Sequence, residues 1–403
     1  MDISHTRYAS KYWFFFTVLF IVFDYTRIYN ELSLGVVQPL MILILILGYF
    51  IVSSGEYQFA KNRQMICFGL FILLLACYVP FAQNNNYAYK TVKAMLLYLP
   101  FTISVICCVN SFARLKKFIL ILILIEVYIA FYGFTHAGYG PGNYFLDEND
   151  LSLYLNMWIP FCYFLFFAYS SKTAKAVCLA GLIIGLLAVI VSFSRGGFIG
   201  IVVTGGVIWL FSKRKILSLL IIFFMVGLML LYAGPEYWNE MATATDAEGG
   251  TGRARIESWK SGWRMFLDNP LGVGGNNFQV RFPEYQTDWF KRGMWGRVAH
   301  SLWFTLIPEL GIFGICIYMS LLYYNIKDIF WLKNISFAKD EHEKKFLNYT
   351  GRAFVCSLCG YFASGTFLSV LYYAHYWYLI GLIVASVNIA KAYFNPQLQV
   401  NYN

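Results

Sequence analysis

Long apolar runs alternate with short polar segments along most of the chain. A helix needs roughly 20 apolar residues to cross the hydrocarbon core of a membrane, and most of the apolar runs approach that length. The pattern therefore predicts an all-α integral membrane protein with about twelve transmembrane helices. The candidate spans are residues 12–31, 34–54, 64–83, 87–109, 117–134, 150–169, 174–194, 196–212, 215–232, 299–325, 352–371 and 374–393.

One polar segment, residues 233–298, is much longer than the others. Its middle carries apolar residues at the spacing of one helix face. Thr251 can cap the start of this helix, and Asn269-Pro270 ends it. We therefore expect a long loop that contains a short amphipathic helix, whose apolar face lies on the membrane surface or on the helix bundle. The residues of this face are Ile256, Trp259, Trp263, Phe266 and Leu267.

The composition supports the membrane interpretation. Hydrophobic residues make up 59% of the 403 positions and charged residues only 13%, whereas soluble domains contain about 25% charged residues. A net charge of +10 would suit a nucleic-acid-binding protein. However, the basic residues lie mostly in short segments between apolar runs, so they indicate membrane topology and no nucleic-acid partner. We expect one polytopic domain over residues 1–403, with membrane lipids around it.

The distribution of basic residues predicts the orientation of the chain. With the N-terminus in the cytoplasm, the cytoplasmic segments hold nineteen Lys and Arg residues, whereas the short outer segments hold only Arg27, Lys90, Lys93 and Arg195. Basic residues favour the cytoplasmic side of a membrane. Both termini are therefore predicted to be cytoplasmic. The loop 233–298 then lies on the extracytoplasmic face, together with Arg195 and His300.

Three arginines on the outer face are candidates for binding an anion. Arg195 lies in the tight turn Ser194-Arg195-Gly196-Gly197, and Arg253 and Arg255 begin the loop helix. A guanidinium group binds phosphate through two parallel hydrogen bonds. Arg255 is the stronger candidate of the loop pair, because it lies one turn before Trp259 and points the same way. The alternatives are that Arg195 only reaches toward the membrane surface and that the loop arginines pair with acidic neighbours.

Further candidates lie in or near other spans. His300 opens the span after the loop, where a histidine can transfer a proton, although a structural hydrogen bond is the alternative. Glu309 lies deeper in the same helix, and an intramembrane acid is either functional or a structural partner. Lys93 can contribute positive electrostatic potential at the outer face. The acidic run Asp147-Glu148-Asn149-Asp150 cannot direct all its oxygens to one point on a helix, so we predict no metal site.

These motifs resemble, in order along the chain, those of the O-antigen ligase/polymerase superfamily (Wzy/WaaL-like, with a Wzy_C domain). The turn around Arg195 resembles the S-R-G-G motif, and the loop resembles the R-x-x-x-W and P-hydrophobic-G-x-G motifs. The segment from His300 to Gly314 resembles the H-N and E-x-G motifs. The similar core covers residues 190–315. Ser301 stands where the family usually has Asn, a form more similar to the O-glycosylation ligases found with exosortase systems.

The resemblance implies a metal-independent, inverting glycosyl transfer that needs no cofactor. The donor would be a polyprenyl-diphosphate-linked glycan, and the acceptor a hydroxyl of a glycan, lipid or protein. Arg195 and Arg255 would hold the diphosphate, and His300 would position or deprotonate the acceptor. Arg253, Lys93 and Glu309 form a second tier of substrate-binding candidates. The protein would lie in the bacterial inner (cytoplasmic) membrane with its active site facing the periplasm or exterior.

The residues do not separate a polysaccharide polymerase from a lipid A-core ligase or a protein O-glycosylation ligase. A different class of function, a transporter or flippase for lipid-linked glycans, is the alternative. Such a protein should have charged residues along an internal cavity and an internal repeat. Here the candidate residues gather at one membrane face and the sequence has no repeat of domain size, so we favour the enzyme.

Overall fold

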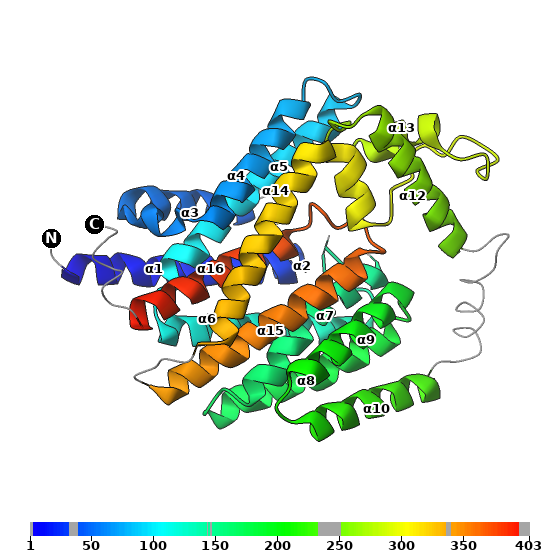
Figure 1. The fold of residues 1–403 in the computed structure, drawn as a ribbon. Helices are drawn as coiled ribbons and strands as arrows, with labels where there is room; N and C mark the ends of the chain where they lie inside the picture. The colour runs from blue at the N-terminus through cyan, green and yellow to red at the C-terminus, as the bar shows by residue number, and fades with distance from the viewer. Residues whose placement is uncertain are drawn as a thin grey trace.

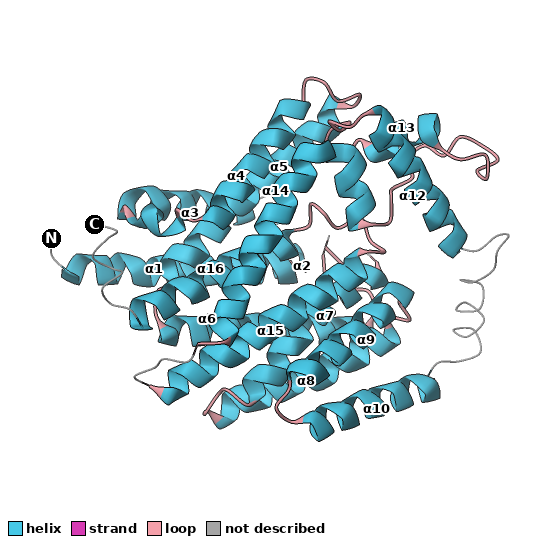
Figure 2. Cartoon of the chain, in the orientation of Figure 1, coloured by secondary structure: helices cyan, strands magenta, loops and turns pink. Residues whose placement is uncertain are grey.

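The computed structural model of the protein describes residues 3–31, 39–142, 144–145, 147–232, 251–335 and 340–394. All regular elements in this part of the chain are helices, and it contains no strand (Figure 2). The helices are α1 (Ile3–Thr26), α2 (Ile28–Glu31), α3 (Pro39–Ser54), η1 (Glu56–Ala60), α4 (Arg63–Tyr78), α5 (Asn85–Cys108), α6 (Phe112–Thr135), α7 (Glu148–Phe166), α8 (Lys172–Val191), α9 (Arg195–Phe211), α10 (Lys215–Tyr232), α12 (Thr251–Asp268), α13 (Phe278–Tyr285), α14 (Leu302–Lys333), α15 (Glu341–Gly365) and α16 (Ala374–Phe394).

The helices confirm the all-α fold class. Each predicted span coincides with one helix, namely α1, α3 to α10 and α14 to α16. Among the helices of the described ranges, four (α5, α6, α8 and α14) are long and apolar enough to cross a membrane. The protein is therefore a multi-pass membrane protein, while the count of twelve spans stays a prediction.

The helix α7 forms the centre of the bundle. Residues 150–165 of α7 are buried without interruption, as expected for a helix that is apolar on all sides. α7 packs against α8, α9 and α15, and α15 also packs against α14. On the other side of the molecule, α5 packs against α1, α3, α4 and α16 (Figure 1). The helices α12 and α13 lie at one end of this bundle, far from the start of α1 and the end of α16 (Figure 1).

A break in α14 anchors the segment that follows α12. Gly311 has φ 59° and ψ −157°, which interrupts the helix and leaves backbone groups without helical partners. The segment 270–274 supplies those partners. The amide of Gly274 donates to the carbonyl of Glu309 (2.8 Å), and the amide of Ile312 donates to the carbonyl of Pro270 (3.0 Å). A Cβ on Gly311 would lie 2.2 Å from the carbonyl carbon of Leu271, so this close approach requires glycine.

Candidate active site

The turn between α8 and α9 is fixed against the start of α7. The Ser194 hydroxyl accepts a hydrogen bond from the amide of Gly197 (2.8 Å), which caps α9, and donates to Oδ1 of Asn149 (2.6 Å). A Cβ on Gly197 would lie 2.3 Å from Cβ of Ser152, so the glycine permits the two helices to meet. Arg195 is consequently held at the first position of α9, half-buried at the end of the bundle.

Trp259 joins the loop helix to the segment that carries the candidate histidine. Its indole Nε1 donates to the carbonyl of Ala299 (3.1 Å), and its ring stacks on Phe304 with centroids 5.4 Å apart and planes 3° apart. Arg255 lies one turn earlier in α12, on the side of Trp259. The R-x-x-x-W motif therefore has a structural reason, because the tryptophan fixes the arginine relative to His300.

The loop helix is confirmed as α12, but its apolar face is only partly used for packing. Ile256, Trp263 and Leu267 are exposed, whereas Met265 is buried in a small cluster with residues of the following loop. The exposed apolar side chains lie along one stripe of α12. This arrangement favours the interpretation that the stripe lies on the membrane surface and does not pack on the bundle.

His300 lies outside the helices, immediately before the residue that caps α14. Its φ of 48° is in the left-handed region, which few residues other than glycine adopt. The side chain of Ser301 then accepts a hydrogen bond from the amide of Phe304 (3.4 Å) and caps α14. Within the described residues, neither ring nitrogen of the half-buried His300 makes a hydrogen bond. A strained backbone that presents an imidazole without a structural partner is typical of a functional residue.

Positive charge surrounds this histidine. Burial and the nearby charges of Arg255 and Arg297 together lower the pKa of His300 to about 4, while the charge of Asp147 opposes them. Burial and the charge of Arg195 likewise lower the pKa of Arg255. These mutual effects place the three arginines and His300 in one group, which we call the arginine cluster. A bound anion would relieve the repulsion within this cluster.

The arginines of the cluster differ in how they are held. Arg255 makes no ion pair and no hydrogen bond within the described part of the chain, although it is half-buried. Arg297 donates from Nε to the Ser258 hydroxyl (2.7 Å) and lies over the ring of Phe290 at 4.9 Å. Arg297 is not among the candidates predicted from the sequence. Its position three residues before His300 was the available signal, but the family motifs do not include it.

The second-tier candidates have other partners. Nε of Arg253 pairs with the carboxylate of Glu257 (3.3 Å), and Nζ of Lys260 pairs with the same carboxylate (2.9 Å). Lys93 is exposed on α5, whose main neighbours are α1, α3, α4 and α16. Those helices carry none of the clustered side chains. The structure therefore supports the alternative that Arg253 pairs with an acidic neighbour. It does not bring Lys93 to the cluster.

Glu309 holds the loop to the bundle. One carboxylate oxygen accepts hydrogen bonds from the amide of Asn276 and the hydroxyl of Tyr372, both at 2.7 Å. The other oxygen accepts from the amide of Phe278 (3.1 Å). These bonds support the structural alternative for Glu309 and explain why an acid is tolerated in an apolar helix. Its assignment as a substrate-binding residue stays a prediction that the contacts do not favour.

The acidic run at the start of α7 caps this helix and adds negative charge to the site. Asp147 accepts a hydrogen bond from the amide of Asn149 (2.6 Å) and caps α7, while Asp150 accepts from the Tyr373 hydroxyl (3.4 Å). Over the ranges that the structure describes, no three side chains of His, Cys, Asp or Glu are placed to hold a metal ion. Asp147 instead provides a negative charge close to His300 and Arg255.

Comparison with protein families gives a match to this region. Residues 180–319 match the O-antigen ligase family (Wzy_C), and the matched segment contains Arg195, Arg255 and His300. This finding confirms the resemblance to the O-antigen ligase/polymerase superfamily that the motifs predict. A comparison with curated proteins gives no match.

Proposed function

We propose, from the O-antigen ligase domain at residues 180–319, that the protein is a membrane glycosyltransferase. It moves a glycan from a polyprenyl-diphosphate-linked donor to an acceptor hydroxyl at the extracytoplasmic face of the bacterial inner membrane. The observation that carries this proposal is the arginine cluster, in which Arg255 and Arg297 lie near His300 and Arg195 lies near Arg255. Both a polysaccharide polymerase and a ligase would use this chemistry.

The arginines would act on the leaving group. When the glycosidic carbon separates from the diphosphate, negative charge develops on the phosphate oxygens. Guanidinium groups that are already fixed beside those oxygens stabilise this charge without reorganisation, and each can bind through two N–H groups. Arg255 is best suited to this role, because its donors have no other partner among the described residues.

His300 would act on the acceptor. The lowered pKa keeps the imidazole neutral at pH 7, so it can take the proton of the acceptor hydroxyl. The acceptor oxygen then forms a bond to the anomeric carbon while the bond to the diphosphate breaks, and attack from the opposite side inverts the anomeric configuration. A bound diphosphate adds negative charge beside the arginines, which raises the pKa of His300 and makes it a stronger base in the complex.

The lipid tail of the donor has a suitable place next to Arg195. An apolar cavity of about 170 Å³ lies between α8, α9 and α10 and is lined at one end by Phe193 and Ser194, directly before Arg195. Further lining residues are Ile190, Val202 and Ile222. We place the first isoprene units of the donor in this cavity, because the diphosphate at Arg195 would then continue into apolar surroundings.

The test is a transfer assay with the purified full-length protein in lipid nanodiscs, a polyprenyl-diphosphate glycan and an acceptor glycan. A glycosyltransferase forms a longer or newly attached glycan and releases polyprenyl diphosphate. A flippase would move the donor across the bilayer of a vesicle and form no new glycosidic bond. We expect turnover to survive an excess of chelator. Turnover that stops with chelator and returns with a divalent ion would contradict the metal-independent mechanism.

A further inference from the structure

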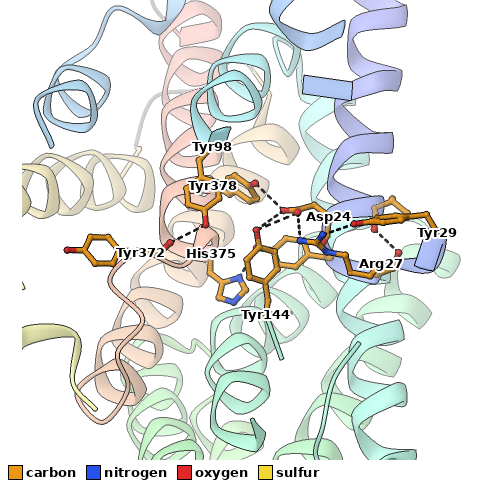
Figure 3. Close-up of polar contacts among 11 residues, drawn as sticks. Asp24, Arg27, Tyr29, Tyr98, Tyr144, Tyr372, His375 and Tyr378 are labelled. Atoms are coloured by element: carbon orange, nitrogen blue, oxygen red, sulfur yellow. Dashed lines mark hydrogen bonds and ion pairs between the residues drawn. The ribbon is translucent and has the colours of Figure 1, made fainter. Parts of the chain in front are cut away.

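A second cavity, of about 430 Å³, is lined by residues of α1, α3, α5 and α16. Figure 3 shows polar side chains that line it. Its volume is within the range of small-molecule sites, about 300–1,000 Å³. None of the arginine cluster lines it. One side of the cavity is polar and is formed by Asp24, Arg27 and the hydroxyl-bearing side chains of Tyr29, Tyr98, Tyr144 and Tyr378. We call it the tyrosine cavity.

The other side of the tyrosine cavity is apolar. Pro39, Leu40, Met41 and Ile44 of α3 face it, together with Leu97 of α5. A ligand that fits both sides must combine polar groups with an apolar surface. Sugars have this property, since their hydroxyls lie around the ring edge and their C–H groups form apolar faces that pack on aromatic rings.

A buried carboxylate organises the polar side. Asp24 accepts hydrogen bonds from the hydroxyls of Tyr378 (3.0 Å) and Tyr144 (3.4 Å), and it pairs with Nη2 of Arg27 (3.2 Å) (Figure 3). Nη1 of Arg27 donates to the Tyr29 hydroxyl (2.6 Å). The carboxylate neutralises the guanidinium group. The cavity therefore suits uncharged hydroxyls better than a second phosphate group.

Arg27 keeps donors available for a ligand. A guanidinium group has five N–H donors, and here Nε donates to the backbone carbonyl of Asp24 while Nη1 and Nη2 use one donor each. The remaining two donors have no partner within the described residues. The side chain is only 17% exposed, its backbone is held at φ 50°, and it lies over the ring of Tyr144 at 5.4 Å. It is thus a fixed pair of donors beside the cavity.

We propose that the tyrosine cavity binds an uncharged saccharide unit of the acceptor glycan. Arg27 donates to ring-edge hydroxyls, the tyrosine hydroxyls donate and accept, and the rings and α3 cover the C–H faces. Calling this saccharide the acceptor rests on the proposed function, whereas its binding to the cavity does not.

The cavity is close enough to the arginine cluster for one glycan to reach both. Tyr144 lines the cavity, and Asp147, three residues later, affects the pKa of His300. A chain segment of three residues spans at most about 11 Å. A short oligosaccharide seated in the cavity can therefore present its end to His300 while the donor diphosphate occupies the arginines from the side of α9 and α12.

Two neighbouring leucines on α5 provide a matched test. Leu97 lines the cavity, whereas Leu96 is 48% exposed and does not line it. The probe is the repeat-unit oligosaccharide released from the lipid-linked donor of the host strain, and its Kd is measured with full-length protein in nanodiscs. We expect Leu97→Trp to fill the cavity and weaken binding at least about ten-fold, and Leu96→Trp to stay within about two-fold of wild type.

A milder variant keeps the test valid if the Leu97 variant does not fold. Tyr29→Phe removes one hydroxyl and should weaken binding about 2- to 10-fold, the value of one hydrogen bond. Wild-type affinity in both Leu97→Trp and Tyr29→Phe would overturn the proposal, as would no binding to the wild type. Because this assay measures binding without turnover, its outcome is separate from that of the transfer assay.

A second arm separates the saccharide from an attached lipid. The same oligosaccharide is compared in its released form and in its lipid-linked form. If Leu97→Trp weakens the binding of both forms by a similar factor, the cavity is a saccharide site. A loss confined to the lipid-linked form would mean that the cavity holds the lipid, and it would overturn the proposal.

Discussion

The arginine cluster and the tyrosine cavity both contain a fixed guanidinium group, but only one of them neutralises its charge. Arg27 lies 3.2 Å from the Asp24 carboxylate, whereas Arg255 has no ion pair in the described part of the chain and lies near two other arginines. Unneutralised guanidinium groups attract phosphate, and a neutralised one offers directed donors to uncharged oxygens. The partner of an arginine, rather than the arginine alone, therefore indicates what it binds.

The two regions also differ in construction. The arginine cluster combines side chains from α9, α12 and the segment before α14. Trp259 of α12 contacts Ala299 and Phe304 and so joins α12 to that segment. The tyrosine cavity lies among helices of the bundle and is organised by one buried carboxylate. A change in the cluster should therefore alter turnover strongly, and a change in the cavity should alter mainly acceptor affinity. The following predictions test that difference in order of expected effect.

The largest effect is expected from His300→Ala. Loss of a general base typically lowers the rate about 10²- to 10⁴-fold, while the arginines still hold the donor. The transfer rate and the Kd for the lipid-linked donor should be measured separately on the same preparation. A large loss of donor affinity in this variant would instead make His300 a phosphate ligand.

Arg195→Ala should follow, with a rate about 10²- to 10³-fold below wild type, the usual cost of one donor to a developing negative charge. Arg195→Lys should recover little of this loss, because an ammonium group cannot form the two parallel bonds of a guanidinium. The measurement is the initial transfer rate of each folded, membrane-inserted variant, compared with that of wild type. Near-normal rates in the Ala variant would show that Arg195 only reaches toward the membrane surface.

A smaller effect is expected in the apolar cavity beside Arg195. Val202 lines this cavity and its neighbour Val203 does not. Val202→Trp should raise KM about ten-fold for long-chain donors, the equivalent of about two buried CH₂ groups, and leave KM for short-chain prenyl donors unchanged. Val203→Trp is the control. Equal KM changes for long and short chains would place the tail elsewhere.

The smallest effect concerns pH. His300 acts as a base only when neutral, and its pKa in the free protein is about 4, so kcat/KM should fall as the pH decreases toward that value. Arg297→Gln removes one of the charges that lower this pKa, so the acidic limb should move to higher pH. Arg292→Gln, at an exposed position of the same loop, is the control. If the acidic limb of the kcat/KM profile is at the same pH in Arg297→Gln as in wild type, the charge of Arg297 does not lower the pKa of His300.

The sequence predicted the parts of the fold and site that depend on local patterns. Apolar runs predicted the helices, and the spacing of Arg255 and Trp259 on one helix face predicted their common direction. Trp259 bonds to Ala299, and the charge of Arg255 acts on the adjacent His300. Arg297 belongs to none of the motifs, and its closeness to His300 in the sequence was the only signal, because an irregular loop carries no periodic pattern. Glu309 looked like a functional acid because its partners, including the distant Tyr372, cannot be seen in its own helix.

The tyrosine cavity was invisible in the sequence for a similar reason. Asp24, Tyr98, Tyr144 and Tyr378 lie far apart in the chain, and each alone resembles an interfacial residue of a membrane helix. Only the packing of α1, α5, α16 and the segment between α6 and α7 brings them to one cavity. Motifs of one family therefore indicated the proposed donor region, whereas the tertiary structure was needed for the proposed acceptor region.

The central claim is that the clustered arginines bind the donor diphosphate, and one measurement tests it most directly. The Kd for polyprenyl diphosphate is determined in nanodiscs for wild type, Arg255→Ala and Arg264→Ala, the last at an exposed position of the same helix. We predict affinity at least about ten-fold weaker for Arg255→Ala and unchanged affinity for Arg264→Ala. Equal affinity in all three proteins would contradict the account.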